Sequence, residues 1–207
     1  MGGKATLAAR FHFGRKFREA KEREAEIMNR QRKGFTLIEI LIVTAIIGIL
    51  ASLLIPVFLS AIQKAKQKGT MQDMNGIAKS MIDYITDVGQ APDQSGPIVP
   101  GSAFIDELRP YYMKSLPMID QWGMAFEVYC GTAVDSAGIG GVTSTGADDF
   151  VIISLGRDRL QTPFSFDPMD PGTVYFLLTA LPSFDQDLII WNGSWIHAPK
   201  TGQVGRV

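Results

Sequence analysis

The sequence has little of what most enzymes and disulfide-stabilised proteins use. Cys130 is its one cysteine, so no disulfide forms within these 207 residues and no CxxC metal or redox pair exists. We expect Cys130 to be a buried strand residue. The patterns HExxH, GxSxG and GxxxxGK[ST] are missing. His197 is the one histidine after Gly34, and its place near a glycine-rich tail predicts a surface residue. We therefore expect no enzyme.

Charge is missing from one long segment. No Asp, Glu, Lys or Arg stands between Ile40 and Ile62. This stretch exceeds the ~18–20 apolar residues that a helix needs to cross a bilayer. No small-x-small cleavage site follows it, which argues against an ordinary secretory signal. The sequence therefore predicts a single membrane-spanning helix.

Charges of opposite sign flank that segment. Residues 1–34 contain ten Lys or Arg and four Glu, whereas the remainder is acidic. Basic residues before an apolar run keep an N-terminus in the cytoplasm, although Lys64, Lys66 and Lys68 reduce the asymmetry. We expect the acidic remainder outside the cytoplasm, and we expect no nucleic-acid partner for it.

A single carboxylate, Glu39, stands at the start of the apolar segment, where an unpaired charge is costly. The stretch KGFTLIEILIVTAIIGILASLLIP resembles the prepilin N-terminus of type IV pilins and type II secretion pseudopilins. The matching positions are Lys33, Gly34, Phe35, Thr36, Leu37, Ile38, Glu39 and Pro56.

The resemblance implies cleavage between Gly34 and Phe35 by a prepilin peptidase, a membrane aspartic peptidase, and N-methylation of the new Phe35 amine. It also implies that Glu39 pairs with the Phe35 amine of a neighbouring subunit during filament assembly. Glu39 lies one helical turn after Phe35, and a buried charge with a waiting partner selects register. Residues 1–34 would then be a cytoplasmic leader that is cleaved.

The leader is long for this family, and Met28 begins a leader of ordinary length, MNRQRKG. We favour Met28 as the true start. The alternative is a basic cytoplasmic helix over 1–27 that touches anionic lipid.

The helix is predicted to extend from Phe35 to Val88 in two halves. Residues 35–62 are apolar all round and form the transmembrane or filament-core half, with a helix break predicted at Gly48 and Pro56. Residues 63–89 form an amphipathic half that ends at Gly89. Its apolar positions recur every three or four residues: Met71, Met74, Ile77, Ala78, Met81, Ile82, Ile85 and Val88.

Residues 90–207 are predicted to form a periplasmic α/β globular domain. The expected elements are a connecting segment over 90–119 with a short helix at 103–112, strands at 124–130 and 150–155, a loop at 131–149, and an ambiguous segment at 174–181. A hairpin is expected over 188–196 around Asn192-Gly193, where turn chemistry explains the sequence better than the overlapping glycosylation pattern. The fold class is α+β and pilin-like, with the long helix packed against a small antiparallel sheet.

A second resemblance concerns the globular domain. LPMIDQWGMAFEVY (116–129), DDFVIISLGRDRL (148–160) and FDQDLIIWN (184–192) resemble stretches of the major pseudopilins of type II secretion. Ala125 replaces a usual proline, and Arg159 a usual glycine. Acids of that region hold calcium in the family, which implies Asp158, Asp185 and Asp187 as ligands. The alternative is that these acids cap turns in a solvated loop. No other cofactor is expected.

The resemblances imply a structural subunit of a type II secretion pseudopilus that drives protein export. Expected partners are other copies of the chain, minor pseudopilins, the prepilin peptidase and a membrane assembly platform. The expected location is the inner membrane, single-pass, with the N-terminus cytoplasmic and the domain periplasmic, and then a periplasmic filament. One alternative is a type IV pilus pilin for adhesion, motility or DNA uptake. A membrane-anchored periplasmic enzyme is the alternative of another class.

Overall fold

The computed structural model describes residues 21, 34–170 and 172–200. Nearly all of the predicted leader, 1–34, and the start at Met28 therefore lie outside the described residues. The chain divides into two compact units, Met1–Leu53 and Leu54–Val207. The long helix α2 (Leu37–Val88) begins in the first unit and ends in the second.

The first turns of α2 are apolar on every side. Within the described residues, α2 is the one helix long and apolar enough to span a membrane, and none of its most apolar 18-residue stretch is buried. Ile38, Leu41, Ile46 and Leu50 are all more than half exposed. Apolar surface of this extent requires lipid or a protein partner.

The helix α2 continues through Gly48 and Pro56, so the break predicted at these residues is not present in the single subunit. The physical reason is that Pro56 removes one N–H donor, the one for the Ser52 carbonyl, while the turns on either side keep theirs. A loosening of this stretch on packing into a filament stays a prediction.

The later turns of α2 bury one stripe, as the sequence pattern predicts. The fully buried side chains Met74, Ile77 and Met81 lie on it. The helix ends at Val88 because Gly89 takes a left-handed conformation, φ 87°, and its N–H donates to the Ile85 carbonyl at 2.7 Å.

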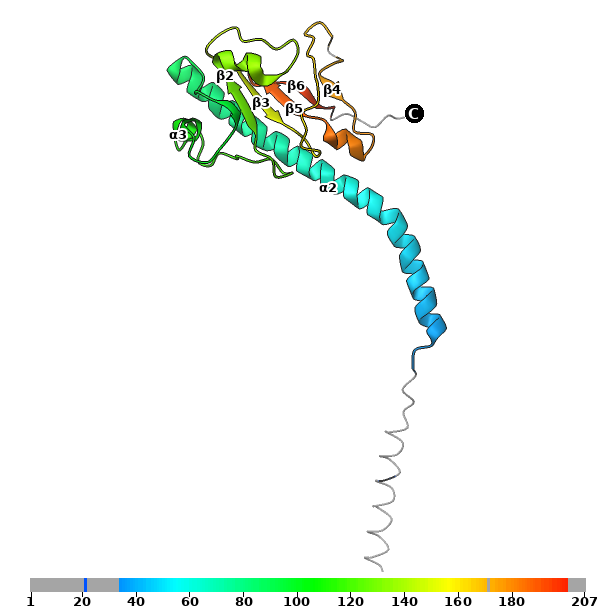
Figure 1. Ribbon diagram of the computed structural model, residues 1–207. Coiled ribbons are helices and arrows are strands. Elements are labelled where there is room, and N and C mark those ends of the chain that lie inside the picture. The colour runs from blue at the N-terminus through cyan, green and yellow to red at the C-terminus, as the bar shows by residue number, and fades with distance from the viewer. Residues whose placement is uncertain (1–20, 22–33, 171, 201–207) are drawn as a thin grey trace, which may run out of the picture. The chain divides into compact units, whose positions relative to one another are not determined.

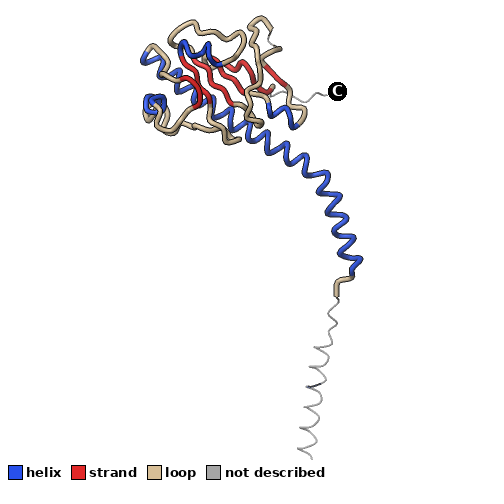
Figure 2. The backbone as a smooth tube through the Cα atoms, viewed as in Figure 1, coloured by secondary structure: helices blue, strands red, loops and turns tan. Residues whose placement is uncertain are grey.

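The second unit contains a six-stranded sheet in the order β1-β2-β3-β5-β6-β4, with α2 along one face (Figure 1, Figure 2). All neighbours are antiparallel except β4 and β6, which are parallel. The other elements are a short helix, α3, and two 3-10 helices, η1 and η2. The bounds are β1 Ser95–Pro97, α3 Ala103–Leu108, β2 Glu127–Cys130, η1 Gly131–Ala137, β3 Phe150–Ser154, β4 Tyr175–Phe176, η2 Leu181–Asp185, β5 Leu188–Trp191 and β6 Ser194–Pro199.

The central strand β3 is buried on both faces. Phe150 and Ile152 point into the core that contains the α2 stripe. Val151 and Ile153 point to a second core beneath η1 and the loop that follows it. Alternate residues of one strand therefore serve two cores, which explains why β3 reads as a continuous apolar run in the sequence.

Most of the predicted elements are confirmed. Phe126, Val128 and Cys130 face one core, and burial raises the pKa of the Cys130 thiol to about 12. The hairpin turn at Asn192-Gly193 has positive φ at both residues, 49° and 80°, as a type I′ turn requires. Strand β1 lies in the segment expected to be a connection, and η1 opens the loop expected over 131–149. The ambiguous segment 174–181 is strand β4 followed by the start of η2.

His197 corrects the prediction of a surface histidine. It lies on β6 and is 9% exposed. Its ring packs against Phe164, with 4.2 Å between ring centroids, and against Phe176 at 5.0 Å. Burial lowers the pKa of His197, because the charged imidazolium loses its hydration. The tail position in the sequence was misleading because β6 extends to Pro199 and pairs with both β5 and β4.

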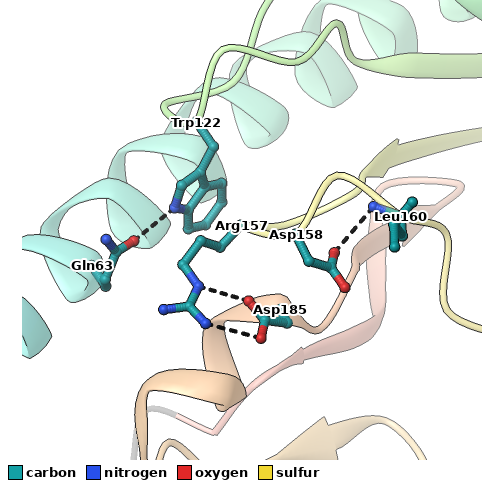
Figure 3. Close-up of polar contacts among 6 residues, drawn as sticks. All are labelled: Gln63, Trp122, Arg157, Asp158, Leu160 and Asp185. Carbon is teal, nitrogen blue, oxygen red and sulfur yellow. Dashed lines mark hydrogen bonds and ion pairs between the residues drawn. The ribbon is translucent and has the colours of Figure 1, made fainter.

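Asp120 joins the segment before β2 to the sheet. Its Oδ1 accepts the backbone N–H groups of Trp122 and Met124, both at 2.9 Å. Its Oδ2 accepts the hydroxyl of Ser154, the last residue of β3, at 2.8 Å. Trp122 in turn donates its indole N–H to Gln63 of α2 at 2.8 Å. One buried carboxylate therefore positions the turn that connects α2 with β3 (Figure 3 shows the Gln63–Trp122 contact).

We predict that Asp120→Ala lowers the free energy of unfolding by about 2–4 kcal/mol, because it leaves the buried Ser154 hydroxyl and two N–H groups without an acceptor. Asp120→Asn should cost clearly less, since its carbonyl oxygen can still accept from Trp122 and Met124. Urea unfolding of the detergent-solubilised chain measures both. Equal losses for the two variants would contradict this role for Asp120.

We also predict that the stability of the chain falls with decreasing pH because of His197. Its folded-state pKa lies below the unfolded value of about 6.5, so its contribution is present above that pH and is lost as the pH falls through the folded-state pKa. Melting temperatures of the parent and His197→Phe, compared from neutral pH to about pH 5, measure this. The variant should show a shallower decline, and parallel curves would count against the prediction.

Candidate functional site

The predicted processing segment precedes and opens α2. Gly34, Phe35 and Thr36 are non-helical, and all three are exposed. The Phe35 side chain is 79% exposed. The peptide bond between Gly34 and Phe35 thus lies in accessible, non-helical backbone next to a helix start. Protease active sites require such backbone, because a helical peptide bond is folded away from them.

The first helical turn is closed by a reciprocal pair of hydrogen bonds between Thr36 and Glu39. The Glu39 carboxylate accepts the Thr36 N–H at 2.8 Å and the Thr36 hydroxyl at 2.9 Å. The Glu39 N–H donates back to the Thr36 hydroxyl oxygen at 3.2 Å. This arrangement is a capping box, and it satisfies N–H groups that the helix start leaves unpaired. Thr36 enters the sequence prediction only as part of the prepilin resemblance, and its capping role was missed, although the spacing Thr-x-x-Glu is the signal of a capping box.

The carboxylate of Glu39 keeps capacity for a further partner. Both bonds from Thr36 reach the same oxygen, Oε2. No residue in the described part of the chain donates to Oε1. The side chain is exposed, so a cation from outside this chain can approach Oε1 without disturbing the capping box.

The three acids predicted as calcium ligands lie around the end of β3 and the start of β5, but each has its own partner. Asp185 accepts from the guanidinium of Arg157, at 2.7 Å from Nε to Oδ1 and 3.0 Å from Nη2 to Oδ2 (Figure 3). Asp158 accepts the N–H of Leu160 at 3.1 Å, which is a local turn contact.

Asp187 is 1% exposed. Its Oδ2 accepts the Thr162 N–H at 2.8 Å, whereas its buried Oδ1 has no partner among the described residues. Burial, and then the negative charges of Asp158 and Glu127, raise the pKa of Asp187 to about 7, against the opposing effect of the Thr162 bond. A free oxygen on a buried carboxylate offers one ligand to a cation or a site for a proton.

These residues do not fit calcium as the predicted set of three. Over 34–170 and 172–200, no group of three or more His, Cys, Asp or Glu side chains is arranged to hold a metal. Both oxygens of Asp185 already serve Arg157, and the positive guanidinium would repel a divalent cation beside it. Arg157 is the residue of this region that sequence reasoning missed.

Comparisons with known proteins agree with the N-terminal site. The family described as "Prokaryotic N-terminal methylation motif" matches residues 29–55, which include Gly34, Phe35 and Glu39. Type II secretion system core protein G of Aeromonas hydrophila is 30% identical over 109 residues, 49% of this chain and 76% of that protein. A fimbrial protein of Neisseria meningitidis serogroup B is 33% identical over 89 residues, 43% of this chain and 51% of that protein.

A longer match includes the globular domain. Type II secretion system core protein G of Dickeya chrysanthemi is 31% identical over 178 residues, which are 82% of this chain and 94% of that protein. No solved structure matches the chain. The similarity to the Dickeya protein is too long to come from the N-terminal helix alone. The chain therefore belongs to the type II secretion system core protein G family, the major pseudopilins.

Proposed function

We propose that the chain is the structural subunit of a type II secretion pseudopilus, a helical filament whose growth drives protein export. The observation that carries the proposal is the segment Gly34–Glu39. In this segment an exposed peptide bond, the predicted cleavage site, precedes an apolar helix whose first turn is capped by the Glu39 carboxylate. Membership in the core protein G family supports the assignment of this filament to a type II secretion system.

Cleavage between Gly34 and Phe35 creates a positive amine one turn before Glu39. Thr36 remains in the mature chain, so the capping box survives the cleavage. The free Oε1 of Glu39 can then accept the Phe35 amine of the next subunit. In an apolar environment this ion pair is strong, and a charge left without its partner is costly. It therefore selects the axial register of subunits.

The exposed apolar turns of α2 supply the environment for that pair. Before assembly they lie in the inner membrane, with the leader in the cytoplasm and the globular domain in the periplasm. During assembly the same surface packs against other subunits in the filament core. The prepilin peptidase, minor pseudopilins and a membrane assembly platform are the partners this pathway requires. The chain acts as a structural element and not as an enzyme.

A type IV pilus subunit is the second candidate. Similarity to the fimbrial protein of Neisseria meningitidis serogroup B supports this candidate. The match to the Dickeya protein, which extends through the globular domain, favours the secretion pseudopilus.

A deletion strain separates the two candidates. We expect loss of secreted proteins from the culture supernatant while surface pili remain on the cells. Complementation with the parent sequence should restore secretion. Lost pili with an unchanged supernatant would assign the chain to the pilus system instead.

We predict that Glu39→Ala is cleaved and held in the membrane but enters filaments about tenfold less, because the Phe35 amine of the neighbour loses its partner. The measurement is the ratio of subunit in sheared filaments to subunit in the membrane fraction. Normal incorporation of Glu39→Ala into filaments would contradict this role for the Glu39 charge.

Two matched variants separate charge from capping. Glu39→Gln retains an oxygen that accepts from Thr36 but removes the charge, so it should assemble as poorly as Glu39→Ala. Thr36→Val removes the hydroxyl bonds but keeps the charge, so it should assemble far better than either. The reverse order would show that the capping box and not the ion pair governs assembly.

A further inference from the structure

The loop after β3 and the segment before β5 are fastened to each other by a guanidinium. Arg157 and Asp185 are 28 positions apart and meet in the two-point ion pair already described, each side chain about one-third exposed or less. Hydrogen bonding to Asp185, and then the charges of Asp185 and Asp158, raise the pKa of Arg157, so the group stays charged. A planar fork against a carboxylate fixes orientation as well as distance.

The backbone holds the same two segments together. The Arg157 N–H donates to the Phe184 carbonyl at 2.9 Å. At Gly156, φ is 69°, and a Cβ there would lie 2.8 Å from the Gln186 carbonyl oxygen. The backbones of the two segments thus touch along 156–157 and 184–186. The Arg157–Asp185 ion pair adds a side-chain contact between the same segments (Figure 3).

The second arginine of the stretch GRDR also serves as an internal cation. Arg159 has φ 65°, and its Nη2 donates to the Trp122 carbonyl at 2.9 Å. The two arginines of one turn therefore bind a carboxylate and a carbonyl oxygen, the kinds of oxygen that a calcium ion binds in loops. They join the turn after β3 to η2 on one side and to the Trp122 turn on the other.

We propose that the Arg157 guanidinium takes the place of a calcium ion at Asp185. The segment from η2 to β5 then folds, and stays packed against the loop after β3, without calcium. A divalent ion at Asp185 would have to displace a guanidinium held by two hydrogen bonds. The family resemblance that implies calcium at Asp185 thus does not extend to this chain. The inference concerns the stability of the globular domain and holds whichever filament system the subunit serves.

The first test compares the full chain, purified in detergent, in millimolar calcium and in excess EGTA. The melting temperature and the rate of proteolysis within 177–187 should be the same in both conditions. A calcium-dependent rise in melting temperature, or faster proteolysis in EGTA, would overturn the proposal.

The second test removes the guanidinium. Arg157→Gln should lower the melting temperature by about 2–4 °C, as expected for a partly exposed two-point ion pair in a chain of this size, and should speed proteolysis within 177–187. Arg157→Lys keeps the charge but not the fork and should fall between parent and Arg157→Gln. The matched control is Arg109→Gln, since Arg109 is exposed and its Nε donates to the Lys114 carbonyl, at 3.3 Å. The control should change neither measurement.

A double-mutant cycle gives the decisive comparison. Combining Arg157→Gln with Asp185→Asn should cost less than the sum of the two single losses, because each removes the same contact. Strict additivity, or no loss in Arg157→Gln, would overturn the proposal. If Arg157→Gln alone becomes stabilised by calcium, the result supports it, because the ion then binds where the guanidinium was.

Discussion

The packing of α2 against the sheet is the contact on which the rest of the globular domain depends. Met74, Ile77 and Met81 are fully buried there, and each contributes roughly 2–3 kcal/mol by leaving water. Strand β3 reaches this core with Phe150 and Ile152 and passes Val151 and Ile153 to the opposite face. This small sheet requires the helix packed against one of its faces, because short strands alone bury too little apolar surface.

The two halves of α2 are suited to two different environments, an apolar one for the early turns and the surface of the globular domain for the later turns. Its early turns expose apolar side chains on every side, whereas its later turns bury one stripe and leave polar residues outside. This division follows from the sequence, because an apolar run without periodicity and a run with a period of 3.6 predict these two environments. A subunit built this way can leave the membrane when other subunits supply an equivalent apolar surface.

Local signals in the sequence were sufficient for α2, β3 and the Asn192-Gly193 hairpin, because periodicity and turn chemistry act between near neighbours. The spacing of Thr36 and Glu39 is also a local signal, of a capping box, but no capping box was predicted from it. Strand β1 escaped prediction because its residues, Ser-Gly-Pro, have low strand propensity and pair only through the tertiary fold. The partner of Arg157 was also unpredictable, since an ion pair across 28 positions depends on where the chain returns.

Two carboxylates show how one chain can separate folding from assembly. Asp185 finds its cation within the same chain, so its charge is satisfied as soon as the domain folds. Glu39 accepts from Thr36 with one oxygen and keeps the other available, at the edge of an apolar surface where an unpaired charge is costly. In the assembly proposed above, its missing cation would be created by cleavage before Phe35 and would belong to another subunit. On this proposal, folding does not wait for assembly, while assembly would be restricted to subunits whose leader has been removed.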